Sequence, residues 1–116
     1  MHQQTLFDEP IQPTTQPRRA MPGMSLVDQF RAFHAANPHV YDALRNLALR
    51  LRNNGHRRIG MKMLFETLRY QYMINTSDPN SDFKLNNNYT AYYARLLMDN
   101  EPVLAGAFET RERRAA

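Results

Sequence analysis

The spacing of apolar residues divides the chain near residue 23. Before that point apolar residues are few and follow no helical period, and the segment is rich in proline, glutamine and threonine. A segment of this composition cannot bury enough apolar surface to offset the entropy lost on ordering. We therefore expect residues 1–23 to form a disordered tail and residues 24–116 to form a helical domain.

From Ser25 onward the apolar residues recur at helical spacing, which predicts the first two helices. Ser25 and Asp28 are spaced like a capping box, so the first helix begins there. Asn37 and Pro38 end this helix and begin the next, because proline is favoured at a first helical position. The second helix ends at Gly55, a residue suited to a left-handed C-cap. Its buried face is predicted by the spacing of Val40, Leu44, Leu47 and Leu51.

A third helix is predicted from about Arg58 to Met73. Its expected core stripe consists of Ile59, Met63, Leu64, Leu68 and Tyr72. Lys62 and Glu66 are spaced to pair on its outer side. A polar connection over residues 76–86 follows, in which Phe83-Lys84-Leu85 would form either a short strand or an anchor.

Asn87 or Asn88 is expected to cap a fourth helix that runs from Tyr89 to Met98. A last short helix is expected after Pro102. The predicted fold class is thus all-α, a small domain of about five helices behind a disordered tail. Helix-turn-helix and winged-helix arrangements both remain open.

Composition excludes several kinds of chemistry. The 116-residue chain contains no cysteine, which excludes disulfides, thiolate metal sites and thiol nucleophiles. No apolar run approaches the roughly 20 residues of a membrane span, and the first nine residues do not resemble a secretory signal. We expect a cytoplasmic protein with no membrane partner. The net charge of +4 permits contact with nucleic acid without requiring it.

Candidate catalytic chemistry is scarce. The four histidines lack metal-ligand spacing, the glycines are isolated and do not form a phosphate-binding loop, and the serines lack a nucleophile-elbow motif. We expect no catalytic residue, no bound metal and no cofactor. The sequence predicts a protein that is not an enzyme.

The most specific pattern lies in the tail. Gln3-Gln4-Thr5-Leu6-Phe7 resembles the short Q-x-x-L-F motif by which bacterial polymerases and repair proteins bind the DNA sliding clamp. Leu6 and Phe7 would fill an apolar pocket on that partner, and the Gln3 amide would hydrogen-bond at its rim. Two alternatives remain open: the pair packs on its own domain, or the pattern is a coincidence.

A basic span on the domain suggests phosphate contacts. Glu66 is the only acidic residue between positions 45 and 69, and seven cationic residues lie there: Arg45, Arg50, Arg52, Arg57, Arg58, Lys62 and Arg69. Arg45 and Arg52 are seven apart, on one helix face, and Arg57, Arg58 and Lys62 follow. We take these five as the candidate nucleic-acid contacts. The alternative is a basic face that only contacts water.

The start of the fourth helix extends this candidate surface. Asn88, Tyr92 and Arg95 are placed there, and asparagine and arginine can contact base edges. A helix N-terminus also favours phosphate. Tyrosines at helical spacing are, however, often core residues.

Most of the domain, from Phe33 to Arg111, resembles a group of small bacteriophage and prophage proteins without a settled activity. The resemblance rests on three stretches, the first being Phe33-His34-Ala35-Ala36-Asn37-Pro38-His39-Val40-Tyr41. The others are Ile59-Gly60-Met61-Lys62-Met63-Leu64-Phe65-Glu66 and Phe83-Lys84-Leu85-Asn86-Asn87-Asn88-Tyr89, and the resemblance ends near Phe108-Glu109-Thr110-Arg111. The resemblance implies a bacterial host cell and assigns no residue a role.

Three functional hypotheses follow. The leading one is a phage accessory protein of DNA metabolism, bound to the sliding clamp by its tail and contacting double-stranded DNA or a second protein with its basic domain. The second is a winged-helix transcription regulator. The third is an inhibitor of a host protein.

Overall fold

The computed structural model describes residues 11–17, 23–78 and 80–109, and the regular secondary structure in these parts is entirely helical. The helices are α1 (Leu26–Ala36), α2 (Pro38–Asn53), α3 (Met61–Asn75) and α4 (Thr90–Asn100). Two 3-10 turns, η1 (Asn87–Tyr89) and η2 (Pro102–Leu104), precede and follow α4. The predicted fold class is confirmed, although the last expected helix is reduced to a short 3-10 turn.

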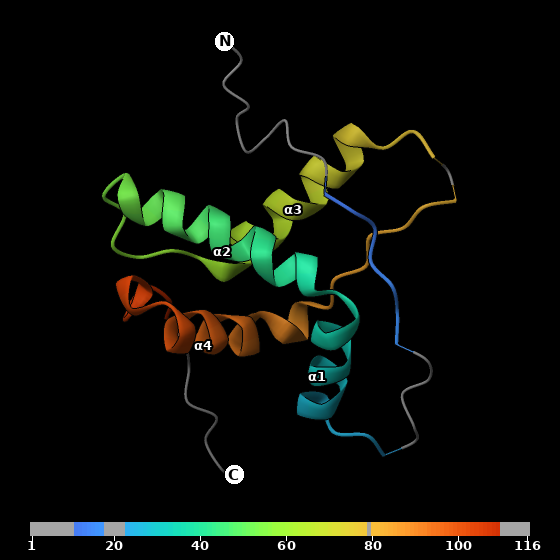
Figure 1. Ribbon diagram of the computed structural model, residues 1–116, viewed down its shortest axis with the longest axis horizontal. Helices are drawn as coiled ribbons and strands as arrows, with labels where there is room; N and C mark the ends of the chain where they lie inside the picture. The colour runs from blue at the N-terminus through green and yellow to red at the C-terminus, as the bar shows by residue number, and fades with distance from the viewer. Residues whose placement is uncertain (1–10, 18–22, 79, 110–116) are drawn as a thin grey trace.

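The helices enclose one core. α3 packs against both α2 and α4, and α1 packs against the start of α2 (Figure 1). The fully buried side chains include Phe33, Leu44, Phe65, Tyr93 and Leu97, so every α-helix contributes to this core.

The start of α1 and both ends of α2 follow the prediction. The hydroxyl of Ser25 accepts a hydrogen bond from the backbone N–H of Asp28 at 3.2 Å, as expected of an N-cap. Pro38 is the first residue of α2, and Gly55 adopts the left-handed conformation with φ of 94° just beyond its end. Local sequence signals are sufficient here because each cap acts within a few residues of itself.

α3 begins three residues later than expected, at Met61 instead of Arg58. The backbone N–H of Ile59 donates to the carbonyl of Ala107 at 2.8 Å, and the Ile59 side chain is buried. This contact holds the preceding residues in an extended path, so the helix starts after Gly60. The expected inward position of Met63 is wrong: this side chain is half exposed, and Met61 and Phe65 are buried instead.

The connection between α3 and α4 is anchored to the core. Phe83 stacks on Tyr72 with ring centroids 5.4 Å apart, and Leu85 is buried. The described residues of this connection contain no strand, so Phe83-Lys84-Leu85 acts as the anchor. The expected cap at Asn87 or Asn88 is wrong: Asn86 caps η1, its side chain accepting from the N–H of Asn88 at 2.8 Å, and α4 follows without a side-chain cap.

Residues 11–17 depart from the tail expected for residues 1–23, because they lie against the helical domain. Figure 1 shows this segment running beside the connection that precedes α4. Thr14 donates its N–H to the carbonyl of Asp82 at 2.9 Å, and its hydroxyl accepts from the N–H of Lys84 at 2.7 Å. Ile11 packs against the core. Composition did not reveal this docking because the partners are about 70 residues away in the sequence.

Candidate functional site

The tail motif, including the predicted contacts Gln3, Leu6 and Phe7, lies outside the described residues. Its distance from the domain is nevertheless limited by covalent geometry. Phe7 is four residues before Ile11, and a fully extended chain spans at most about 14 Å over that length. A partner that bound Phe7 would therefore contact the chain within that covalent distance of Ile11, which packs against the core.

Asn37 holds the segment that follows the motif. Its side-chain oxygen accepts the Thr15 N–H at 2.7 Å, and its side-chain nitrogen donates to the carbonyls of Thr15 at 2.8 Å and Phe33 at 3.0 Å. Asn37 is fully buried. Burying an amide without hydrogen bonds would cost free energy, so these three bonds stabilise the folded state with residues 11–17 in place. This residue was expected to end a helix, and its long-range role left no local sequence signal.

Two of the predicted nucleic-acid contacts have structural partners. Arg45 forms a two-pronged ion pair with Glu101, in which Nε and Nη2 lie 3.2 and 3.3 Å from the carboxylate oxygens. The hydrogen bond and charge of Glu101 raise the pKa of Arg45 above its usual value. Arg52 donates to the carbonyls of Val103 at 3.0 Å, Arg57 at 2.6 Å and Ala105 at 3.3 Å. Both side chains thus join α2 to the segment that follows α4.

Four other basic residues of the span are exposed near the α2–α3 turn. The fifth, Arg69, is paired with Glu66, the acidic residue that was expected to pair with Lys62. Arg57, Arg58 and Lys62 make no ion pair within the described parts of the chain, and the same holds for Arg50. Arg50 lies in the basic span, although it is not one of the five residues of the span that were predicted to contact nucleic acid. Arg50 has no ion pair among the described residues, and the sequence could not show this because the pairing of Arg45 with Glu101 depends on the fold. We name these four residues the basic turn cluster.

The basic turn cluster rests on a fixed backbone. The N–H of His56 donates to the carbonyl of Leu51 at 3.1 Å, and Ile59 is bonded to Ala107. Arg52 additionally binds the carbonyl of Arg57. Arg57 and Arg58 are consequently presented from a turn whose backbone is tied on both sides, with Arg50 on α2 before it and Lys62 on α3 after it. The turn lies at the end of the molecule where η2 also lies (Figure 1).

The start of α3 and the first half of α4 share an open hollow of about 510 Å³. Its lining includes Arg58, Lys62, Thr90 and Glu109. The structure therefore brings two of the predicted cations close to α4. The carboxylate of Glu109 at the same hollow offsets part of their charge.

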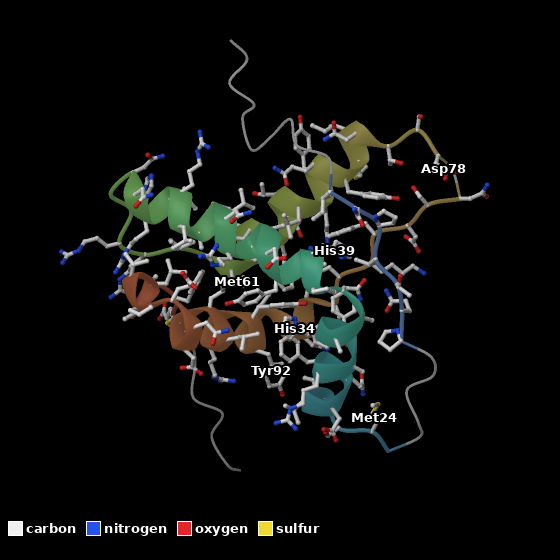
Figure 2. The ribbon with its side chains drawn as sticks, viewed as in Figure 1. Met24, His34, His39, Met61, Asp78 and Tyr92 are labelled. Atoms are coloured by element: carbon white, nitrogen blue, oxygen red, sulfur yellow. The ribbon has the colours of Figure 1, made fainter. Side chains whose placement is uncertain are left out.

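Three residues predicted to contact nucleic acid, Asn88, Tyr92 and Arg95, lie on or just before α4 and have different surroundings. Tyr92 lies beside α1 (Figure 2), stacked on Phe30 at 5.2 Å. The guanidinium of Arg95 lies 6.0 Å from the centre of the Tyr92 ring. Asn88 is exposed in η1. Of the three, only Asn88 is fully exposed, whereas Tyr92 and Arg95 are half-buried.

The described residues offer limited support for a winged helix. They contain no strand, so the β-hairpin wing of that fold is not found in them. The connection from α3 to α4 spans residues 76–86, which is longer than a tight helix-turn-helix turn.

The buried polar groups do not form a reactive cluster. His34 lies among the rings of Phe30, Tyr41 and Tyr93, with centroid distances of 5.9, 5.4 and 6.1 Å (Figure 2). Burial lowers the pKa of His34, and the charge of Asp42 opposes this effect. No group of three metal-binding side chains occurs within the part of the chain that the structure describes. Among these same residues, no helix is both long and apolar enough to cross a bilayer.

No protein-family model matches the chain, and neither a curated protein nor a solved structure matches it.

Proposed function

We propose that this protein is an accessory factor of DNA metabolism that binds the bacterial DNA sliding clamp. The observation that carries the proposal is the Q-x-x-L-F pattern at Gln3, Leu6 and Phe7. The resemblance of the domain to small phage and prophage proteins gives the setting, an infected or lysogenic bacterium. In this role the protein performs no catalysis.

The anchored segment at residues 11–17 supports this proposal. A short linear motif binds weakly on its own, and a second contact by the same molecule raises the overall affinity. With three residues between Phe7 and Ile11, a clamp held by the motif would lie close to the domain. The helical domain would then supply the second contact, to the clamp itself or to the DNA that the clamp encloses.

The basic turn cluster favours double-stranded DNA as that second partner. Arg50, Arg57, Arg58 and Lys62 are exposed and lack ion pairs among the described residues. Cations without a carboxylate partner can bind phosphates without first breaking an internal pair. Asn88 and Arg95 are secondary contacts in this proposal, whereas Arg45 and Arg52 act through the fold.

Clamp binding can be tested by measuring the affinity of purified sliding clamp for the full chain by calorimetry. We expect Leu6→Ala with Phe7→Ala to abolish binding, and Gln3→Ala to weaken it. Gln4→Ala is the matched control, because it alters the neighbouring glutamine at a variable position of the motif. Unchanged binding by the double variant would refute the proposal.

A further inference from the structure

α3 carries a second apolar stripe that faces away from the core. The exposed fractions are 51% for Met63, 56% for Tyr70 and 51% for Ile74, and the adjacent Met73 is 72% exposed. Large apolar side chains gathered on one face in this way are typical of an interaction surface. The stripe is independent of the basic turn cluster and of the tail motif.

The stripe has the spacing of a coiled-coil seam. Met63, Thr67, Tyr70 and Ile74 follow one another at intervals of four, three and four residues, which is the pattern that lets one helix pack along another. The hydroxyl of Thr67 donates to the carbonyl of Met63 at 2.8 Å. Its hydrogen bond is therefore satisfied within α3, and its methyl group can enter an apolar contact.

The order of side chains in the seam is complementary to itself. If two copies of α3 pack antiparallel about a two-fold axis between Leu68 and Arg69, Met63 of each copy meets Ile74 of the other. The small Thr67 then meets the large Tyr70. A two-fold interface requires this kind of self-complementarity: if one residue contacts a second residue of the other copy, that second residue contacts the first in return.

The charges beside the seam are compatible with the same arrangement. Glu66 is paired with Arg69 of its own helix, and in the antiparallel arrangement it lies beside Met73 of the other copy. The two Arg69 residues lie nearest the two-fold axis, and each is paired with Glu66 of its own helix, which limits their mutual repulsion.

We propose that α3 is a homodimer surface on which a second copy of this chain packs antiparallel along Met63, Thr67, Tyr70 and Ile74. The seam spans eleven residue steps, or about 16 Å of helix. An interface of this length belongs to the small end of specific contacts. The dimer therefore dissociates on dilution and forms at high protein concentration.

Sedimentation equilibrium of the full chain, from micromolar to millimolar concentration, tests the surface. The wild-type chain should shift from monomer to dimer. Met63→Lys and Ile74→Glu, each alone, should remain monomeric over this range, while the helical circular dichroism stays unchanged because both positions are exposed. Val103→Lys is the matched control: Val103 is 52% exposed on η2, so this variant should dimerise like the wild type.

Combining the two substitutions tests the antiparallel order. In the Met63→Lys, Ile74→Glu double variant, each introduced lysine meets an introduced glutamate, and dimerisation should return. An equimolar mixture of the two single variants should form a heterodimer for the same reason. A parallel pair would instead oppose like charges and remain dissociated.

Three outcomes would overturn the proposal. The first is a wild-type chain that stays monomeric at millimolar concentration, which would leave the stripe to the chain's own first ten residues or to another protein. The second is a dimer that survives both single substitutions. The third is failure of the double variant to recover. None of these results bears on clamp binding, which Leu6→Ala with Phe7→Ala tests separately.

Discussion

Buried polar side chains differ in whether they have hydrogen-bond partners, and therefore in whether they stabilise the fold. The Asn37 amide has three hydrogen bonds, whereas the Tyr93 hydroxyl is buried without a partner among the described residues. Burial also raises the pKa of Tyr93, which keeps its hydroxyl neutral. The Tyr93 ring is packed against Phe30 and Phe65 in the centre of the core.

Removing the Tyr93 hydroxyl should not harm the protein. Because a buried hydroxyl without a partner is costly, Tyr93→Phe should leave the free energy of unfolding unchanged or raise it by up to about 1 kcal/mol. Urea denaturation measures this change. Tyr72→Phe is the matched control, since the Tyr72 hydroxyl bonds to Ser81, and it should lower stability by about 1 kcal/mol. A clear loss in the Tyr93 variant would indicate a hidden partner.

His34 should make stability depend on pH. Burial lowers its native pKa below the ordinary 6.5, so the unfolded chain takes up a proton at a higher pH than the folded one. The folded state is thus favoured above pH 6.5, and this contribution is lost as the pH falls below that value. The urea midpoint of the wild type should decrease from pH 7.5 to pH 5.5.

A His34→Gln variant should show a smaller decrease over the same interval, because glutamine does not titrate. His56→Gln provides the control, since His56 is exposed and its replacement should leave the pH dependence as in the wild type. An undiminished decrease in the His34 variant would assign the effect to other groups.

At the scale of elements, Arg52 connects α2 to the segment after α4 by hydrogen bonds. Its three carbonyl partners lie on Val103, Ala105 and the α2–α3 turn. Arg52→Ala should lower the free energy of unfolding by about 1–3 kcal/mol, as expected when bonds to a charged donor are lost. Thermal denaturation followed by circular dichroism tests this value. Arg50→Ala, which removes an exposed arginine two residues away, should have almost no effect.

The bounds of the elements were predictable wherever a cap acts locally. Ser25, Pro38 and Gly55 mark the ends of α1 and α2 because their effects depend on residues within one helical turn. The start of α3 was not predictable, since it depends on the bond between Ile59 and Ala107, 48 residues later. The exposed stripe of α3 was missed in part because Met63 is apolar and was assigned to the core.

At the scale of the whole molecule, the basic turn cluster should dominate any DNA affinity of the domain. Arg57→Ala, Arg58→Ala and Lys62→Ala together should weaken binding to a duplex and reduce the slope of log affinity against log salt by up to about 3. Fluorescence anisotropy over a salt series measures both quantities. Lys84→Ala is the control for charge, because Lys84 is paired with Asp82.

A slope unchanged by the triple substitution would place the DNA contact elsewhere or exclude it. Specific, salt-sensitive binding that also required Arg95 would instead favour a transcription regulator.

The candidate site was only partly predictable from the sequence. Charge density identified the region around the α2–α3 turn, since cations at a polar turn are usually exposed. It did not distinguish Arg57 and Arg58 from Arg52, because that difference depends on carbonyl groups about fifty residues away. The tail motif was proposed from the sequence alone, because a linear motif is defined by residues that are adjacent in the chain.

The bond between Thr15 and Asn37 provides a direct reporter of the N-terminal segment. The Thr15 amide proton is held by a fully buried side chain, so it exchanges with deuterium when the segment detaches from the domain. Hydrogen–deuterium exchange at this one amide would show whether a partner that grips Leu6 and Phe7 leaves residues 11–17 in place or peels them away. Protection that persists in the complex means that residues 11–17 stay docked on the domain while the partner is bound.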